Sequence, residues 1–434
     1  MDDLHLNPPT VREAPDGVEF NLSRAKVPNH ATDQTDSFPL DFDAKALRSK
    51  RLESVRDMMR ENDLGAVLLF DPNNQRYATG SRNMFGYFLR NSTRYIYIPQ
   101  SGDVILFEYP GSAHISTWLE TIQDSRTSKI VFAAVNGRDR LVAKPFAEEI
   151  AVLMQEDCGG NQRVGMDRCT HGLALALEAE GLEVEDCMQM ILHTRRLKLP
   201  EEIACLSLSM SAVETAVWNV EKKLEPGVSE NELFAEMYHG VLMGGGEFIE
   251  TRLLTSGPKT NPWFNEAGSR KVRPGELLAL DTDTVGINGY YADISRTFFC
   301  GPGRPSGYQQ SLYRMSWEQI HHNASILQPG MTFRDIADKA WKIPDRFFDL
   351  RYPSIIHGVG LHGEKPIVAH ACDLDRYTGE GVLEPGMVVS VESYIGEPGG
   401  SEGVKLEDQF VVTETGVQPM SHYPWDDRLL NREV

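Results

Sequence analysis

The spacing of hydrophobic residues changes along the chain, and each change marks an expected element. In residues 43–62, apolar side chains recur every three or four positions, as they do on one face of a helix. Short apolar runs follow at residues 65–71, 94–99 and 104–108, and a second helical spacing covers residues 141–156. Strands that alternate with helices in this way predict an α/β domain.

We expect three segments in the chain. Residues 1–43 contain several prolines and show no sustained periodicity, which is typical of an extended arm. Residues 44–195 form the first domain. The second domain, residues 196–434, begins with a helix at Pro200, because proline suits the first helical position and the two glutamates after it suit the positive end of the helix dipole.

The second domain contains an internal repeat. Residues 272–281 and 383–392 align without a gap: each is a Pro-Gly turn, an apolar strand and then an acid, so that Asp281 matches Glu392. A second pair of segments places a Pro-Gly turn before Ser229 and before Thr332, each followed three residues later by an acid. This spacing predicts a helix N-cap with a capping box. Two similar halves predict one α/β domain with a pseudo-twofold axis.

Composition narrows the class of protein. The chain has 434 residues, 41% hydrophobic and 24% charged, which is ordinary for a globular enzyme of two or three domains. A net charge of −20 makes nucleic acid a poor partner. The apolar runs have the length of strands, so we expect no membrane span. The six cysteines show no Cys-x-x-Cys spacing, and we expect free thiols in a reducing cytoplasm.

Three aspartates lie in one expected hairpin. Asp281 and Asp283 end the first strand, a turn follows around Gly286, and Asp293 stands on the returning strand. Because side chains alternate along a strand, Asp281 and Asp283 should share a face, and Asp293 can meet them from the partner strand. Three carboxylates at one point repel one another strongly without a cation. The hairpin therefore predicts bound metal.

Later motifs extend this pattern and reveal a resemblance. The chain carries DISRTF at 293–298, HGVG at 357–360, PGMVVSVE at 385–392 and GVKLED at 403–408. In this order the motifs, within residues 196–412, resemble the M24 metallopeptidase superfamily, whose catalytic domain has the pita-bread fold. The resemblance also identifies the first domain as a creatinase-type N-terminal domain, and it implies a homodimer.

The resemblance implies six ligands for two divalent metal ions. Asp293 and Glu407 would bridge both metals, Asp283 would bind one of them with Asp281 beside it, and His357 and Glu392 would complete the second. The superfamily normally has a single aspartate about eleven residues before the second aspartate ligand. Here Asp281 stands twelve and Asp283 ten residues before Asp293, so both are kept as candidate ligands. We expect iron, with manganese, zinc and cobalt as alternatives, because carboxylate and imidazole ligands suit them all.

Two positions depart from the peptidases of the superfamily. The peptidases carry a Pro-His pair where this chain has Pro262-Trp263, and the second histidine that they carry after the ligand histidine is missing. These segments look more like the dimethylsulfoniopropionate lyases of the DddP type. An indole is the best aromatic partner for an onium cation. We therefore expect Trp263 to bind a small onium substrate, with Tyr352 as a further wall.

The general base is the open question. The DddP-type lyases carry an aspartate just beyond the segment that matches residues 357–361, and this chain has Gly363 there. His362 or Glu364, the residues on either side of it, are the candidates for the base that removes the α-proton.

Three classes of function remain open. The preferred one is a metal-dependent lyase that cleaves dimethylsulfoniopropionate, or a similar onium carboxylate, to dimethyl sulfide and acrylate. The second is a dinuclear metal hydrolase of the Xaa-Pro peptidase or prolidase type. The third is a non-catalytic use of the fold, which retention of every metal ligand argues against.

Overall fold

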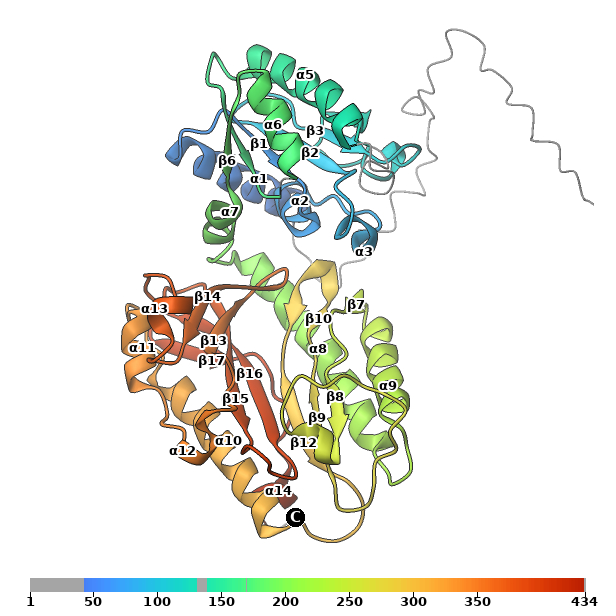
Figure 1. Cartoon of the computed structure of the whole chain (residues 1–434), viewed down its shortest axis with the longest axis vertical. Coiled ribbons are helices and arrows are strands. Elements are labelled where there is room, and N and C mark those ends of the chain that lie inside the picture. Colours follow the sequence, from blue (N-terminus) through green and yellow to red (C-terminus); the bar gives the residue numbers. More distant parts are fainter. Residues whose placement is uncertain (1–42, 131–138, 169, 433–434) are drawn as a thin grey trace, which may run out of the picture. The chain divides into compact units, whose positions relative to one another are not determined.

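The computed structural model describes residues 43–130, 139–168 and 170–432, and the predicted arm lies outside this range except for Asp43. The chain forms two compact units, residues 1–186 and 187–434 (Figure 1). The boundary predicted between residues 195 and 196 falls after the short helix α7 (Met188–Thr194), whereas the structure divides the chain before that helix.

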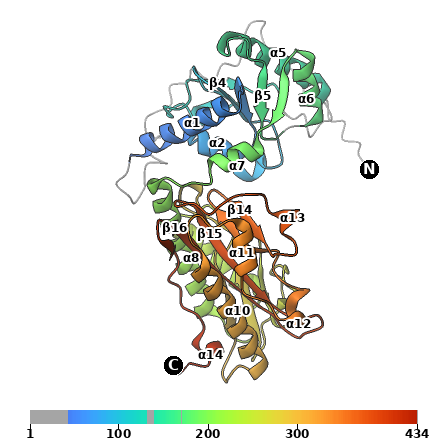
Figure 2. The ribbon, with the colours of Figure 1, turned by 90° about the vertical axis from the view of Figure 1, so that its left-hand side faces the viewer.

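The first unit is a six-stranded sheet with the strand order β4-β3-β2-β1-β5-β6. Helices α5 and α6 lie on one side of the sheet and α1 and α2 on the other (Figure 2). The predicted first helix begins as expected, because the Asp43 carboxylate accepts hydrogen bonds from the Lys45 and Ala46 amides. The elements are α1 (Ala44–Glu61), β1 (Ala66–Leu69), α2 (Pro72–Thr79), α3 (Phe85–Phe88), β2 (Tyr95–Pro99), β3 (Ile105–Glu108), η3 (Ala113–Ile115), β4 (Asp124–Thr127), α5 (Asp139–Asp157), β5 (Arg163–Met166), α6 (His171–Ala179) and β6 (Glu183–Asp186).

The second unit is built on a larger sheet that runs β14-β13-β15-β16-β12-β9-β8, with β17 paired to β16. Helices α8 and α9 lie beside β8, β9 and β12, and α10 lies along β15 and β16 (Figure 1). After α7, its helices are α8 (Pro200–Lys223), α9 (Glu230–Met243), η4 (Gly257–Thr260), η5 (Ile287–Gly289), α10 (Gly307–Ile326), α11 (Phe333–Lys339), α12 (Asp345–Phe348), α13 (Leu374–Tyr377) and α14 (Asp427–Leu430). Its strands are β7 (Phe248–Ile249), β8 (Leu254–Ser256), β9 (Leu277–Asp281), β10 (Thr284–Val285), β11 (Tyr291–Ala292), β12 (Ser295–Phe299), β13 (Ser354–Val359), β14 (Gly363–Ala369), β15 (Val388–Ile395), β16 (Val404–Thr413) and β17 (Gly416–Pro419).

The predicted repeat is visible in the hydrogen bonds. Ser229 forms an isolated antiparallel bridge with Lys271, and Thr332 forms the matching bridge with Val382 in the other half. Both predicted capping boxes are present, on α9 and on α11. The repeat thus places β9 and β15 as equivalent strands, and the acids at equivalent positions on them, Asp281 and Glu392, face the middle of the sheet.

Helix α8 has the length and mean hydropathy of a membrane span. Half of that window is buried inside this unit, where Met210, Val213 and Val217 pack with α9 and β9. Its apolar composition is therefore that of a core helix.

Candidate metal centre

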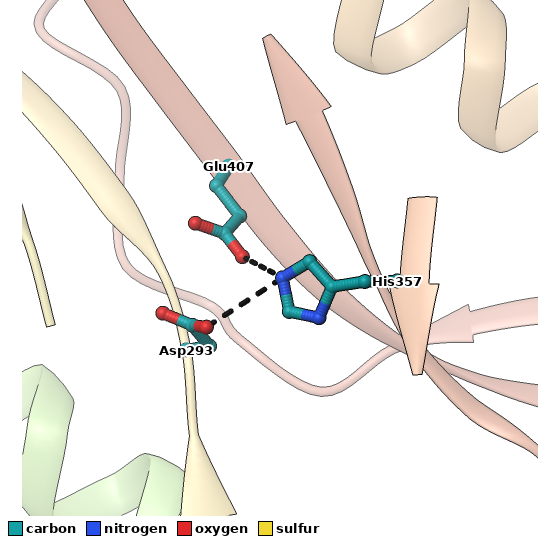
Figure 3. A group of neighbouring side chains, drawn as sticks. All are labelled: Asp293, His357 and Glu407. Atoms are coloured by element: carbon teal, nitrogen blue, oxygen red, sulfur yellow. Dashed lines mark ion pairs between the residues drawn. The ribbon is translucent and has the colours of Figure 1, made fainter. Parts of the chain in front are cut away.

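Neighbouring strands bring the predicted ligands together. Glu407 on β16 stands opposite Glu392 on β15 and opposite Ser295 on β12, and β13, which carries His357, pairs with β15. His357 Nε2 lies 3.2 Å from a Glu392 oxygen and 3.4 Å from a Glu407 oxygen. A third carboxylate, that of Asp293, lies 3.7 Å from the same nitrogen (Figure 3).

The three aspartates form a second group that shares Asp293 with the first. Ligand atoms of Asp281, Asp283 and Asp293 all lie within 4.8 Å of one another. The six predicted ligands thus surround two adjacent positions with Asp293 common to both. This donor set, five carboxylates and one imidazole, fits two divalent cations.

Asp283 lies in this group, but its backbone conformation differs from the predicted one. The strand does not continue through it: β9 ends at Asp281, and Asp283 has a φ of 34° in the left-handed region. Aspartate tolerates this conformation better than most residues. Its carboxylate accepts hydrogen bonds from the hydroxyls of Thr251 and, at 2.9 Å, of Tyr291. Strand alternation was therefore the wrong explanation for the convergence, which instead depends on this break between β9 and β10.

The buried carboxylates resist ionisation together when no metal is present. Burial, and next the carboxylate of Glu407, raise the pKa of Asp293 well above its ordinary value. Burial and the neighbouring Asp281 raise the pKa of Asp283 to about 6. Burial opposes a charge on His357, but Glu392 and Glu407 outweigh it and raise the pKa of the imidazole. Two bound cations would remove this repulsion, and the site therefore fits the metals that its ligand types imply.

An internal cation completes the site. The fully buried Lys405 ammonium lies 2.6 Å from Glu392, 3.0 Å from Glu407 and 3.4 Å from Asp281, and it donates a hydrogen bond to the Ser295 hydroxyl. The sequence offered a signal for this contact, because Lys405 and Glu407 are two residues apart on one strand and share a face. Lys405 offsets part of the carboxylate charge.

The aromatic residues predicted to bind substrate form one buried cluster beside these ligands. Trp263 is 6% exposed and packs with Tyr394 and with the partly buried Tyr352. The Lys405 ammonium lies 4.6 Å from the centroid of the Tyr352 ring, and the ring of Phe264 lies 5.6 Å from it in a tilted arrangement. The indole Nε1 of Trp263 is buried and has no hydrogen-bond partner among the described residues.

A specific loop positions Trp263. The Tyr394 hydroxyl donates to the carbonyl of Thr260 and to the side-chain oxygen of Asn261. The Asn261 amide in turn donates to the carbonyls of Glu397 and Gly400, at 2.8 and 2.9 Å. These contacts fix the backbone at Thr260 and Asn261, just before Trp263, and a sequence alone does not reveal them.

The two candidate bases lie in different surroundings. Glu364 is buried, 2.7 Å from Arg195 and 3.0 Å from Lys198. Burial favours its neutral form, but the two cations outweigh burial and hold the pKa of Glu364 below its ordinary value. A carboxylate held by two cations is a poor base, so the structure argues against Glu364 in that role. His362 is half-buried in the turn between β13 and β14 and contacts the Gly363 carbonyl.

Gly363 lies beside the predicted ligand His357. A Cβ added at Gly363 would stand 3.8 Å from His357 Nδ1, an ordinary contact distance. A side chain at this position would therefore fit without displacing the ligand. A separate cavity of about 360 Å³ between α7, α11 and β14 contains none of the six predicted ligands, and we do not assign it to the site.

The stability of the metal-free protein is expected to fall as the pH rises. Burial and the neighbouring Asp281 raise the pKa of Asp283 from about 4 in the unfolded chain to about 6, so the folded state binds more protons between these values and loses stability as the pH rises through them. His357 has the same sign, because its pKa is raised by folding and its contribution is lost as the pH rises through that raised value. Thermal unfolding of chelator-treated protein from pH 5 to pH 8 should show a falling Tm.

The variant Asp283→Asn is the control for this fall of Tm with pH. It removes one titrating group, so the fall in Tm should be shallower. Added divalent metal should restore stability most at pH 8, where its ligands are deprotonated. A Tm of the metal-free protein that rises with pH would contradict the arrangement of raised pKa values.

Comparisons with known proteins agree with the site and the fold. Residues 204–414 match the metallopeptidase family M24, and residues 51–197 match the creatinase/prolidase N-terminal domain. The chain is 34% identical to the dimethylsulfoniopropionate lyase DddP of Roseovarius nubinhibens, over 90% of this chain and 89% of the relative. It is 33% identical, over the same shares, to the DddP of Roseobacter denitrificans. The solved structure of a Xaa-Pro dipeptidase from Bacillus anthracis matches with a TM-score of 0.70 at 21% identity, covering 87% of this chain and 99% of that one.

Proposed function

The chain belongs to metallopeptidase family M24, and we propose that within this family it is a metal-dependent carbon–sulfur lyase. Its substrate would be dimethylsulfoniopropionate or a similar small onium carboxylate. The observation that carries this proposal is the likeness to two such lyases over nine-tenths of the chain. The likeness to the dipeptidase structure, at 21% identity, supports the fold alone.

The six ligands would hold two divalent metals. Bound there, the metals would supply a Lewis acid for the substrate carboxylate, which makes the α-proton more acidic. Iron, the homodimer and the cytoplasmic location remain predictions.

The remaining requirement of a β-elimination is a base, and we assign this role to His362, which would take the α-proton on an imidazole nitrogen. The electron pair of that C–H bond forms the double bond of acrylate. The bond between the β-carbon and sulfur breaks, and dimethyl sulfide leaves with that bond's electron pair. His362 then releases its proton to solvent.

The aromatic cluster supports an onium group better than a peptide. The indole of Trp263 stands where the peptidases of the family carry a histidine, and it is buried in an apolar cluster. A sulfonium over an indole gains roughly 0.5 to 2 kcal/mol, more where water is excluded. Tyr352 packs against the same cluster, and the Lys405 ammonium lies 4.6 Å from its ring centroid.

The variant Trp263→Leu is expected to raise KM for dimethylsulfoniopropionate by about 2- to 30-fold, the equivalent of that cation–π energy, with a smaller effect on kcat. The KM of Trp263→Phe should lie between those of Trp263→Leu and the wild type, because the benzene ring has a weaker quadrupole than the indole. Trp218→Phe, at a half-exposed tryptophan on α8, is the matched control. A KM that is unchanged in Trp263→Leu would remove this residue from substrate binding.

The alternative is a dinuclear hydrolase of Xaa-Pro dipeptides, which the family and the dipeptidase fold support. Parallel assays of one metal-loaded preparation with dimethylsulfoniopropionate and with a set of Xaa-Pro dipeptides separate the two. We expect dimethyl sulfide and no free proline. Hydrolysis of the dipeptides without release of dimethyl sulfide would favour the alternative.

A further inference from the structure

Three buried charges join the start of the second unit to its edge strand. Glu364 on β14 lies 2.7 Å from the guanidinium of Arg195 and 3.0 Å from the ammonium of Lys198, and all three side chains are at most 2% exposed. The Lys198 amide also donates a hydrogen bond to the Gly386 carbonyl, just before β15. The backbone of Lys198 is therefore tied to the start of β15. Removing one partner of a buried ion pair leaves the other charge uncompensated, which is strongly destabilising.

The carboxylate of this triad stands directly against the turn between β13 and β14. A Cβ added at Gly360 would lie 1.4 Å from a Glu364 oxygen, so only glycine leaves room for it. The Gly360 amide donates to the His362 carbonyl, at 3.1 Å, which closes the turn. The triad thus packs against the turn that carries His362 and Gly363.

The same turn is hydrogen-bonded to the aspartate hairpin. The Tyr291 amide donates to the Gly360 carbonyl at 2.8 Å, and the Tyr291 hydroxyl donates to Asp283. One continuous path of contacts therefore runs from Arg195 and Lys198, through Glu364 and Gly360, to a predicted metal ligand.

We propose that Glu364 is a positioning residue, which with Arg195 and Lys198 locks the Gly360–Gly363 turn and thereby fixes the position of His362. Glu364 does not touch the reacting atoms and acts only through this turn. The inference rests on the proposed function for the identity of the base, but the locking of the turn does not depend on the substrate.

Hydrogen–deuterium exchange of the full-length protein tests the locking directly. In Glu364→Gln, amides of residues 358–363 should exchange about tenfold faster or more, while the rest of the sheet keeps its protection. Glu384→Gln is the matched control. Glu384 pairs with Arg196 at 2.8 Å, in the same segment, and this pair is partly exposed. Faster exchange in Glu384→Gln equal to that in Glu364→Gln, or none in either, would overturn the proposal.

Two milder variants keep the test decisive if Glu364→Gln does not fold. Lys198→Met leaves a neutral Arg195–Glu364 pair, and Gly360→Ala displaces the Glu364 carboxylate without removing any charge. Both should speed exchange in the same residues. Unchanged exchange in both variants would overturn the proposal as firmly.

Kinetics give the second readout. In each variant with a loosened turn, kcat for dimethyl sulfide release should fall at least about tenfold while KM and bound metal stay near the wild-type values, because the base and not the binding site is displaced. A rise in KM and a loss of metal as large as the fall in kcat would indicate a general structural role and contradict positioning. Faster exchange in a protein that releases no dimethyl sulfide would retain the locking of the turn and reject the lyase.

Discussion

Replacing Asp293 by alanine is expected to abolish metal binding and activity together. Asp293 is the carboxylate common to both groups of predicted ligands, with the His357 imidazole 3.7 Å from one of its oxygens. Its loss removes a donor from each metal position at once. Metal analysis of purified Asp293→Ala should find little metal, and dimethyl sulfide release should fall to background.

In the metal-free protein, the same variant is not expected to lower stability. Burial and the surrounding carboxylates disfavour the charge on Asp293, so removing that charge should leave chelator-treated protein no less stable at pH 8 than the wild type. Added metal should raise the Tm of the wild type and leave that of Asp293→Ala unchanged. Asp338→Ala, an exposed aspartate on α11, is the control that should behave as wild type. An Asp293→Ala protein that keeps both metal and activity would refute the site.

Replacing His362 by glutamine is expected to lower kcat by about 10²- to 10⁴-fold, the range for loss of a general base. Glu364, the other candidate, is occupied by Arg195 and Lys198, which leaves His362 for this role. KM and metal content should change little. His422→Gln, at an exposed histidine, is the matched control.

A second substitution should then restore the reaction. The family's lyases carry an aspartate just beyond the matching turn, and Gly363 has room for a side chain 3.8 Å from His357. We expect kcat of the double variant His362→Gln/Gly363→Asp to be at least about tenfold higher than that of His362→Gln. Full activity in His362→Gln alone would remove His362 as the base. Failure of the aspartate to restore any activity would show that the base acts from another position.

The sequence predicted the fold from local patterns, and the residues that the family resemblance implies as metal ligands lie together in the structure. That they bind metal stays a prediction. Pro-Gly turns, capping boxes and apolar strands of fixed length recur in the two halves, and they predicted the pseudo-twofold sheet that carries Asp281 and Glu392 on equivalent strands. Residues that share a strand face, such as Lys405 and Glu407, also follow from spacing alone.

The features that sequence reasoning missed are long-range contacts. The left-handed turn at Asp283 depends on hydrogen bonds from Thr251 and Tyr291, and no spacing encodes them. The ion pairs of Glu364 join residues more than 160 positions apart in the chain, 195 and 364, and they argue against Glu364, one of the two candidate bases. The predicted arm, residues 1–43, lies almost wholly outside the described residues.

The central claim, a metal-dependent elimination from an onium carboxylate, is tested most directly by gas chromatography of the headspace over the purified protein. Full-length protein of known metal content is incubated with dimethylsulfoniopropionate, and acrylate is measured in the same vessel. The account predicts dimethyl sulfide and acrylate in equal amounts, lost on chelation and absent with Asp293→Ala. Protein that carries two metals per chain and releases neither product would contradict it.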